Sequence, residues 1–186
     1  MPRRPGLPRI ELVPLLPGDR YRPAVLALTV LPDQEIYCGR AATTLPQADA
    51  DPARTPFVVL QTTRPAGVVV GFGVLDRVGI LAQLVDEPDR AVLLRGFYVD
   101  ARQQGRGLGT AAAAGVPQLA GSLFPGAELV VLTVNEDNPA AVLAYTRAGF
   151  TDTRVRYLGG DAGPQHVMVA AVPPGPARAR RSSIRP

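Results

Sequence analysis

Three glycines at alternate positions, Gly105, Gly107 and Gly109, are the first residues of this sequence that suggest chemistry. They follow the apolar run "AVLLRGFYV" (91–99), which predicts a buried strand, and they precede a run of small residues that predicts a helix. The first turn of a helix has N–H groups without intrahelical partners and a partial positive charge. Glycines leave such backbone open to a ligand, so the pattern predicts a phosphate site, to which Arg106 can add a charge-assisted contact.

Two nucleotide-binding motifs and a plain turn are the alternatives for this loop. A P-loop ends in Gly-Lys-Ser/Thr, and all 20 basic residues of this chain are arginines. The dinucleotide fingerprint G-x-G-x-x-A is matched by Gly107, Gly109 and Ala112. Its acidic partner would be Glu128, which lies at the start of the next predicted strand and not at its end, and too little chain follows for a doubly wound sheet. A glycine-rich turn without a ligand stays open.

Asn138 and Tyr145 form a second candidate pair. The stretch "NPAAVLAYTRAGF" predicts a helix over 138–150, with Asn138 as N-cap, Pro139 in the first helical position and Gly149 as the left-handed C-terminal cap. Two helical turns separate Asn138 from Tyr145, so both lie on one stripe about 10 Å apart. A phenol on a helix after the next strand can face the same cleft as the glycine loop.

The elements that position these residues predict one α/β domain. Predicted strands cover 10–17, 56–63, 66–76, 91–99 and 127–134, and the runs "TDTRVRYL" and "QHVMVAAV" form a final hairpin. Predicted helices cover 23–30, 33–42 with Asp33 as N-cap, and 107–123, where Gly115 and Pro117 predict a kink or an early end. This order implies a mixed sheet with helices on its faces.

Length and charge bound the organisation and the partners. The 186 residues fit a single domain over 10–172, with a disordered basic leader at 1–9 and a disordered Pro/Arg-rich tail at 173–186. The chain has a formal net charge of +4, but all 16 acids lie between residues 10 and 172, where the net charge is −3. The negative net charge of residues 10–172, called here the body, argues against a nucleic-acid partner. Only weak, salt-sensitive contacts of the tails are expected.

Cysteine usage and hydropathy indicate the compartment. Cys38 is the single cysteine, without a partner for a disulfide or a nearby histidine for a metal site. No apolar run approaches the roughly eighteen residues of a membrane helix, and no apolar segment follows the early arginines as in a signal peptide. We therefore expect a soluble, cytoplasmic protein without a membrane segment or a metal.

The two candidate stretches together resemble the GCN5-related N-acetyltransferases (GNAT). The run "QGRGLG", which begins at Gln104, matches the family's Q/R-x-x-G-x-G/A acetyl-CoA loop, and "NEDNPAAVLAYTRAGF" is similar to the family's N-x-x-A-x-x-x-Y-x-x-x-GF ending. Both occur in the family's order, and the predicted elements over 10–172 match as well. The resemblance implies the GNAT-like acyl-CoA N-acyltransferase fold, a mixed, mostly antiparallel sheet splayed between its fourth and fifth strands with helices on both faces.

The resemblance also implies acetyl-CoA as cosubstrate and places it. Pantetheine would enter between the strands at 91–99 and 127–134, and the pyrophosphate would lie in the loop. Asn138 would lie beside the pantetheine arm and Tyr145 near the sulfur. The expected cofactor-binding residues are Phe97, Tyr98, Val99, Gln104, Gly105, Arg106, Gly107, Leu108, Gly109, Thr110, Asn138 and Tyr145.

Acyl transfer to an amine needs an oxyanion donor, a proton for the leaving thiolate and a base. The backbone N–H near Val99 is the candidate oxyanion donor, and Tyr145 is the candidate that donates a hydrogen bond or proton to the thiolate. For the base, Glu35 and Asp76 are candidates, although each also fits a solvated surface acid. His166, in a terminal apolar strand, is interpreted as a structural residue.

The acceptor is expected to be a primary amine of a small molecule. The runs "PDQEIYCGRA", "TPFVVLQ", "VVVGFGVLD" and "LLRGFYVDARQQGRGLG" are similar to the diamine and spermidine acetyltransferase branch, and Asp33, Glu35 and Asp76 suit a cationic polyamine. The resemblance also makes a homodimer one of the expected arrangements. The alternative from a different class is a non-catalytic acyl-CoA-binding sensor or interaction domain.

Overall fold

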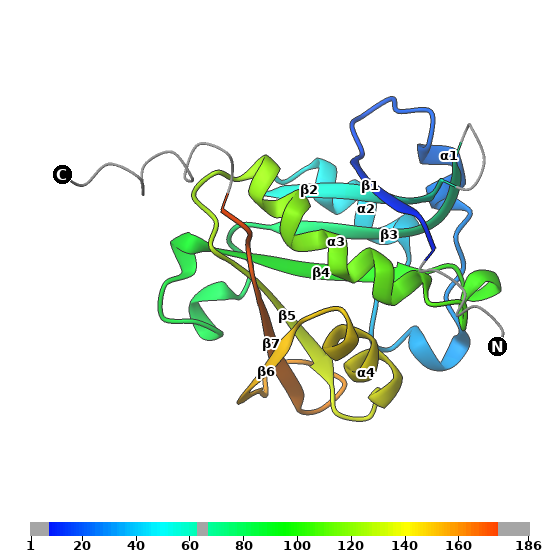
Figure 1. Cartoon of the computed structure of the whole chain (residues 1–186). Helices are drawn as coiled ribbons and strands as arrows, with labels where there is room; N and C mark the ends of the chain where they lie inside the picture. Colours follow the sequence, from blue (N-terminus) through cyan, green and yellow to red (C-terminus); the bar gives the residue numbers. More distant parts are fainter. Residues whose placement is uncertain (1–7, 63–66, 175–186) are drawn as a thin grey trace, which may run out of the picture. The chain divides into compact units, whose positions relative to one another are not determined.

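The computed structural model describes residues 8–62 and 67–174. Within them the strands form one seven-stranded sheet in the order β1-β2-β3-β4-β5-β7-β6 (Figure 1). The strands are β1 (Ile10–Pro14), β2 (Arg54–Gln61), β3 (Val68–Asp76), β4 (Ala91–Val99), β5 (Leu129–Asn135), β6 (Thr151–Tyr157) and β7 (Gln165–Ala171). Each lies where the sequence predicts a strand. The predicted leader, the predicted turn between β2 and β3 and the predicted tail lie wholly or mostly outside the described residues.

The pairings give the predicted mixed sheet. β1 pairs with β2, β5 with β7, and β6 with β7 in antiparallel fashion, which confirms the final hairpin. β4 pairs with β5 in parallel, and that register joins Ala91–Leu93 to Leu129–Val131. This short ladder agrees with the prediction of a splayed pair, because β4 continues to Val99.

The first two predicted helices differ from the observed ones. Helix α1 (Arg22–Leu26) is shorter than predicted. The prediction of a helix over 33–42 is wrong. Instead, Pro32–Gln34 forms a short 3-10 helix that contains Asp33, and α2 (Ala41–Asp49) begins later. Arg40, immediately before α2, has extended backbone (ψ 149°), which separates the two elements.

Helix α3 (Leu108–Leu123) runs without interruption through Gly115 and Pro117, so the predicted early end is wrong. Pro117 has no N–H, which removes one helical hydrogen bond. Packing offsets that loss, because Ala113 and Val116 on this helix are fully buried. Helix α4 (Pro139–Arg147) confirms its predicted caps: the side chain of Asn138 accepts from Ala141 N, and Gly149 has φ +97°.

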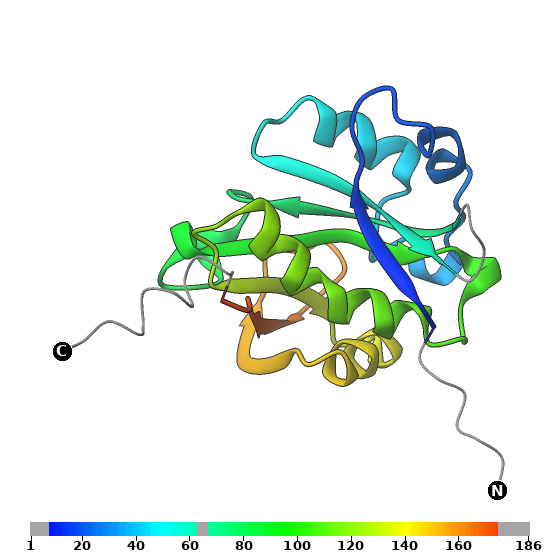
Figure 2. The ribbon, with the colours of Figure 1, turned by 45° about the horizontal axis from the view of Figure 1, so that its top comes forward.

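The chain divides into two compact units. The first comprises Met1–Val74 and Gly96–Gly115, and the second Leu75–Arg95 and Val116–Pro186. In the first unit α1 and α2 cover one face of the strands, where Leu45, Phe72 and Tyr98 belong to one buried core, and the beginning of α3 covers the other face (Figure 2). In the second unit the connection between β3 and β4 packs Leu81 and Leu84 against Val131 and Val167.

In the described part of the chain, no helix is both long enough and apolar enough to cross a membrane.

Candidate active site

The glycine loop joins β4 to α3, and its backbone is open. Gly105 and Gly107 have φ of +74° and +75°, in the left-handed region that side chains disfavour, and neither has an atom within 4 Å of where a Cβ would stand. At the beginning of α3, Ala111 N donates to Gly107 O at 3.0 Å. Within the described residues, the N–H groups of 105–107 donate to no protein acceptor. The loop therefore presents free donors beside a helix N-terminus.

Buried Asp100 anchors the start of this loop. Its carboxylate accepts from Thr29 Oγ1, Arg102 N and Arg102 Nε, each at 3.0 Å, and from the Arg102 guanidinium again at 2.5 Å. The Arg102 side-chain hydrogen bond is the main reason that the pKa of Asp100 is held below its ordinary value. A charged, multiply bonded carboxylate fixes the direction in which the chain leaves β4. Sequence analysis did not single out Asp100, although an acid directly after a strand is a common turn signal.

Gln104 is held by its side chain. Its Nε2 donates to Val99 O at 3.1 Å and to Gln34 Oε1 at 2.8 Å, while Gln34 Nε2 donates to Gln104 Oε1 at 3.2 Å. The structure thus brings together two of the predicted cofactor residues, Gln104 and Val99. It adds Gln34, for which the sequence carries no local signal.

The end of β4 presents its residues to alternate faces. Tyr98 turns into the α2 side, where its hydroxyl accepts from Ala41 N at 2.9 Å and burial is the main cause of its raised pKa. Phe97 lies on the opposite face, with its ring centroid 6.3 Å from that of Phe57. A Cβ on Gly73 would stand 2.5 Å from Phe57 Cζ, so glycine is needed there for these rings to fit.

Arg106 and the first turn of α3 complete the loop. The exposed Arg106 guanidinium donates to Gln103 Oε1. Leu108 is buried and fixes the beginning of the helix. Gly109 is in ordinary contact with Val99, 3.7 Å from its expected Cβ to Val99 Cγ2. Thr110, the remaining predicted residue of the loop, is half-buried.

Asn138 and Tyr145 lie on α4, in the second unit. The Asn138 side chain caps the helix through Ala141 N at 3.1 Å. The Tyr145 ring is half-buried and packs edge-on against Phe150, with ring centroids 5.7 Å apart. Both residues share α4 as predicted, whereas their proximity to the glycine loop stays a prediction.

The candidate acids are both engaged by arginines. Glu35 is exposed and forms an ion pair with Arg40. Asp76 is only 1% exposed, forms an ion pair with Arg95 at 3.0 Å and accepts from Val78 N. The interpretation of Asp76 as a solvated surface acid is therefore wrong: its side chain is buried at the end of β3, although the turn that follows is exposed. No third acidic, histidine or cysteine side chain joins either of them as a metal site in the described residues.

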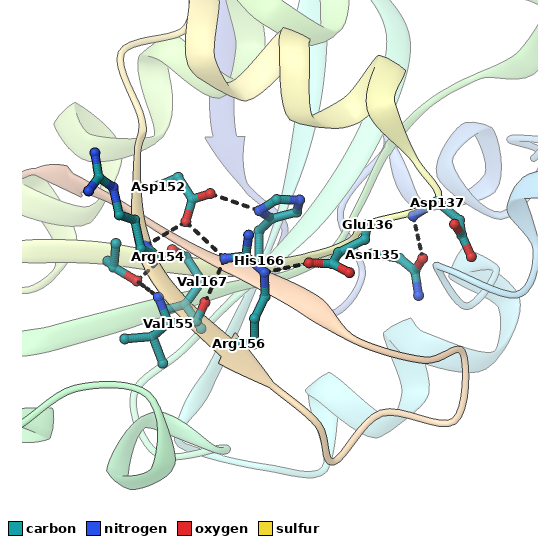
Figure 3. Close-up of polar contacts among 10 residues, drawn as sticks. Asn135, Glu136, Asp137, Asp152, Arg154, Val155, Arg156, His166 and Val167 are labelled. Atoms are coloured by element: carbon teal, nitrogen blue, oxygen red, sulfur yellow. Dashed lines mark hydrogen bonds and ion pairs between the residues drawn. The ribbon is translucent and has the colours of Figure 1, made fainter.

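His166 is part of a polar cluster between β6 and β7. Figure 3 shows its ring directed at Asp152 on the neighbouring strand, with Nδ1 2.8 Å from Asp152 Oδ2. The other oxygen of Asp152 accepts from Arg154 N at 2.7 Å, and this backbone bond is the main reason that the pKa of Asp152 is lowered. Arg154 has φ +67°, at an irregularity in the β6 register. This arrangement agrees with a structural role for His166.

These features define a class of protein: a mixed sheet with a parallel β4–β5 pair, followed by an open glycine loop at a helix N-terminus. The model of the Acetyltransferase (GNAT) family matches residues 24–150. The chain belongs to this family and is an N-acetyltransferase by its family.

Comparisons of the whole chain agree in fold. A search of curated proteins finds no match. Among solved structures, AAC(6')-Ib in complex with paromomycin and acetyl-CoA has a TM-score of 0.66 and 16% identity, covering 95% of this chain and 99% of that one. Spermidine N-acetyltransferase from Vibrio cholerae in complex with CoA and spermine has a TM-score of 0.61 and 15% identity, covering 88% and 95%. At these identities the likeness is one of fold.

Proposed function

We propose that this protein transfers the acetyl group of acetyl-CoA to a primary amine of a small molecule, such as a polyamine or diamine, by direct attack in a ternary complex. The observation that carries the proposal is the open backbone at Gly105 and Gly107, which offers N–H donors and room where any side chain would intrude. These features fit a diphosphate, and the exposed Arg106 adds positive charge. The neighbours that bind CoA together with an aminoglycoside or spermine support the same chemistry.

The reaction balances with two protein groups and a base. The amine nitrogen attacks the thioester carbonyl carbon, the C–S bond breaks, and CoA leaves as thiolate while the amine loses a proton. We assign the N–H of Val99 to the developing oxyanion and the Tyr145 hydroxyl to the thiolate. Glu35 would take the amine proton, directly or through water. A cytoplasmic location and a homodimer stay expectations from the sequence and the family resemblance.

A second candidate function is that of a non-catalytic acyl-CoA-binding sensor. It is favoured by the ion pairs of the two candidate bases, Glu35 with Arg40 and Asp76 with Arg95, because each pair occupies a carboxylate oxygen that a general base would have to turn toward the amine. This alternative keeps the glycine loop and lacks turnover.

Calorimetric titration with acetyl-CoA tests the binding step. We expect the wild type to bind, and Gly107→Ala to bind at least about tenfold more weakly, because alanine strains at φ +75° and its methyl enters the open backbone surface. The matched control is Gly126→Ala, outside the loop, whose methyl meets no atom within 4 Å. Absence of binding at millimolar acetyl-CoA would reject the proposal.

Release of free CoA with a panel of polyamines, amino acids, aromatic amines and aminoglycosides separates the enzyme from the sensor. We expect at least one amine class to give turnover, and Tyr145→Phe to lower kcat more than it weakens acetyl-CoA binding, since the hydroxyl acts on the leaving thiolate. Binding without turnover for every amine would favour the sensor. An unchanged kcat at saturating substrates would remove Tyr145 from the mechanism.

A further inference from the structure

The segment between α1 and α2 is tied to the glycine loop and the strand before it at three places, all within the first unit. Thr29 bonds the Asp100 carboxylate through its hydroxyl, and its carbonyl accepts from Ala101 N at 2.9 Å. Ala41 N donates to the Tyr98 hydroxyl. Between these two ends, the reciprocal amide pair joins Gln34 to Gln104. The end ties involve a buried carboxylate and a buried phenol, whereas the middle tie depends on one side-chain pair.

Gln34 also organises its own surroundings. Its carbonyl accepts from Tyr37 N at 3.0 Å, from Cys38 N at 3.3 Å and from Cys38 Sγ at 3.6 Å. Its N–H donates to Leu31 O at 2.9 Å. Residues 31–38, called here the Gln34 segment, are therefore arranged around the backbone of the residue whose side chain reaches the glycine loop.

We propose that Gln34 is a positioning residue that couples occupancy of the glycine loop to the order of the Gln34 segment. The inference rests on the proposed function, because the ligand of the loop is taken to be acetyl-CoA. The amide pair gives the loop a direct connection to a segment that carries Asp33 and Glu35, the acids that suit a cationic acceptor. Binding of the cosubstrate then prepares the acceptor side before the amine arrives.

Conformational entropy is the physical basis of the coupling. A ligand on the N–H groups of 105–107 restricts the adjacent backbone of Gln104, whose side chain then loses less freedom by staying bonded to Gln34. By linkage, an ordered Gln34 segment must raise the affinity of the loop for the ligand by the same factor. One amide hydrogen bond in a partly exposed setting corresponds to a factor of about five.

Cys38 provides a reporter that does not depend on activity. It is the single cysteine of the chain, and burial, with a smaller contribution from the nearby Glu35 charge, raises the pKa of its thiol to about 11. At pH 8 the closed segment therefore holds an unreactive thiol, and opening of the segment exposes a thiol of more ordinary pKa. Alkylation by iodoacetamide, followed by intact mass, measures this opening.

The experiment compares the alkylation rate of Cys38 with and without saturating acetyl-CoA, which has no free thiol. We expect acetyl-CoA to slow the reaction of the wild type about fivefold. In Gln34→Leu we expect a faster reaction without ligand, loss of the protection by acetyl-CoA, and acetyl-CoA binding weakened by about the same factor in calorimetry. The matched control is Gln47→Leu, the same substitution at an exposed position of α2, which should behave as the wild type.

Two further variants separate coupling from a purely structural role. Gln34→Glu keeps an acceptor for Gln104 Nε2 and should restore part of the protection. Gln104→Leu should remove the protection, and the double variant should be no worse than Gln104→Leu, because both changes break the same pair. If Gln34→Leu raises the rate but leaves the protection by acetyl-CoA intact, the coupling is overturned.

The outcomes also distinguish this inference from the proposed function. If acetyl-CoA does not bind the wild type, the proposed function fails and the coupling fails with it. If acetyl-CoA binds and protects Cys38 equally in the wild type and in Gln34→Leu, only the coupling fails.

Discussion

Asp100 is the residue on which the geometry of the glycine loop depends most directly. It joins Thr29, in the segment after α1, to Arg102 at the start of the loop, and it is 3% exposed. A carboxylate in this position stabilises the fold only while it is ionised. The residue therefore sets both the direction of the loop and part of the acid stability of the protein.

We predict that Asp100→Ala lowers the free energy of unfolding at neutral pH by about 1–3 kcal/mol, because partly buried donors lose their acceptor. Since the pKa of Asp100 is lowered in the folded protein, its contribution is fully present above the pKa of the unfolded chain and is lost as the pH falls through the folded value. The difference between variant and wild type should thus shrink below about pH 4. Urea unfolding from pH 7 to pH 3 measures it.

The matched control for this change is Asp86→Ala, at an exposed position, for which we expect no more than about 0.5 kcal/mol. A difference between Asp100→Ala and wild type that persists undiminished at pH 3 would contradict the assignment of the stabilisation to the ionised carboxylate.

At the scale of elements, strand β3 makes room for the aromatic packing under the site. Gly71 and Gly73 alternate with buried Phe72 and Val74, so one face of β3 carries side chains and the other receives them. The space at Gly73 accommodates Phe57 from β2 and Phe97 from β4. The position of Phe97, a predicted pantetheine neighbour, thus depends on Gly73, a residue of β3 that has no predicted part in the reaction.

We predict that Gly73→Ala lowers the free energy of unfolding by about 1–3 kcal/mol, because its methyl would overlap the buried Phe57 ring. Chemical denaturation measures the change, and Phe57→Leu in the same background should recover part of it. Gly126→Ala, where the added carbon meets nothing within 4 Å, is the control. A neutral Gly73→Ala would show that the two rings can move apart without loss.

At the scale of the whole molecule, the sign of the net charge differs between the body, residues 10–172, and the two ends of the sequence. The acids all lie in residues 10–172, and four of the 20 arginines lie in the last fourteen residues. The basic isoelectric point therefore does not describe the surface around the glycine loop. Any attraction to nucleic acid should originate outside the body.

We predict that replacing Arg178, Arg180, Arg181 and Arg185 together by glutamine weakens the retention on nonspecific DNA that we expect at low salt. The formal net charge then falls from +4 to zero. The salt dependence of binding should flatten by up to about three to four counterions, as expected when four arginine contacts are lost. Acetyl-CoA binding should not change. Unaltered DNA binding with the same salt dependence would contradict a role of these four arginines and place the contacts on residues 10–172 or on the leader at 1–9.

The sequence by itself determined the features that depend on neighbouring residues. Alternating and apolar runs predicted the strands, with β4 correct at both ends, and Asn138, Pro139 and Gly149 predicted the ends of α4. The glycines of the loop were found because residues without side chains between a strand and a helix leave the backbone open to a ligand.

Only the tertiary structure decided the contacts between distant parts of the chain. Gln34 and Gln104 are 70 positions apart, and the Tyr98 hydroxyl meets an N–H 57 positions away. The burial of Asp76 and the continuation of α3 through Pro117 likewise depend on packing by other elements. Local sequence carries the backbone preference of a residue, whereas the energy of these contacts exists only after folding has brought the two partners together.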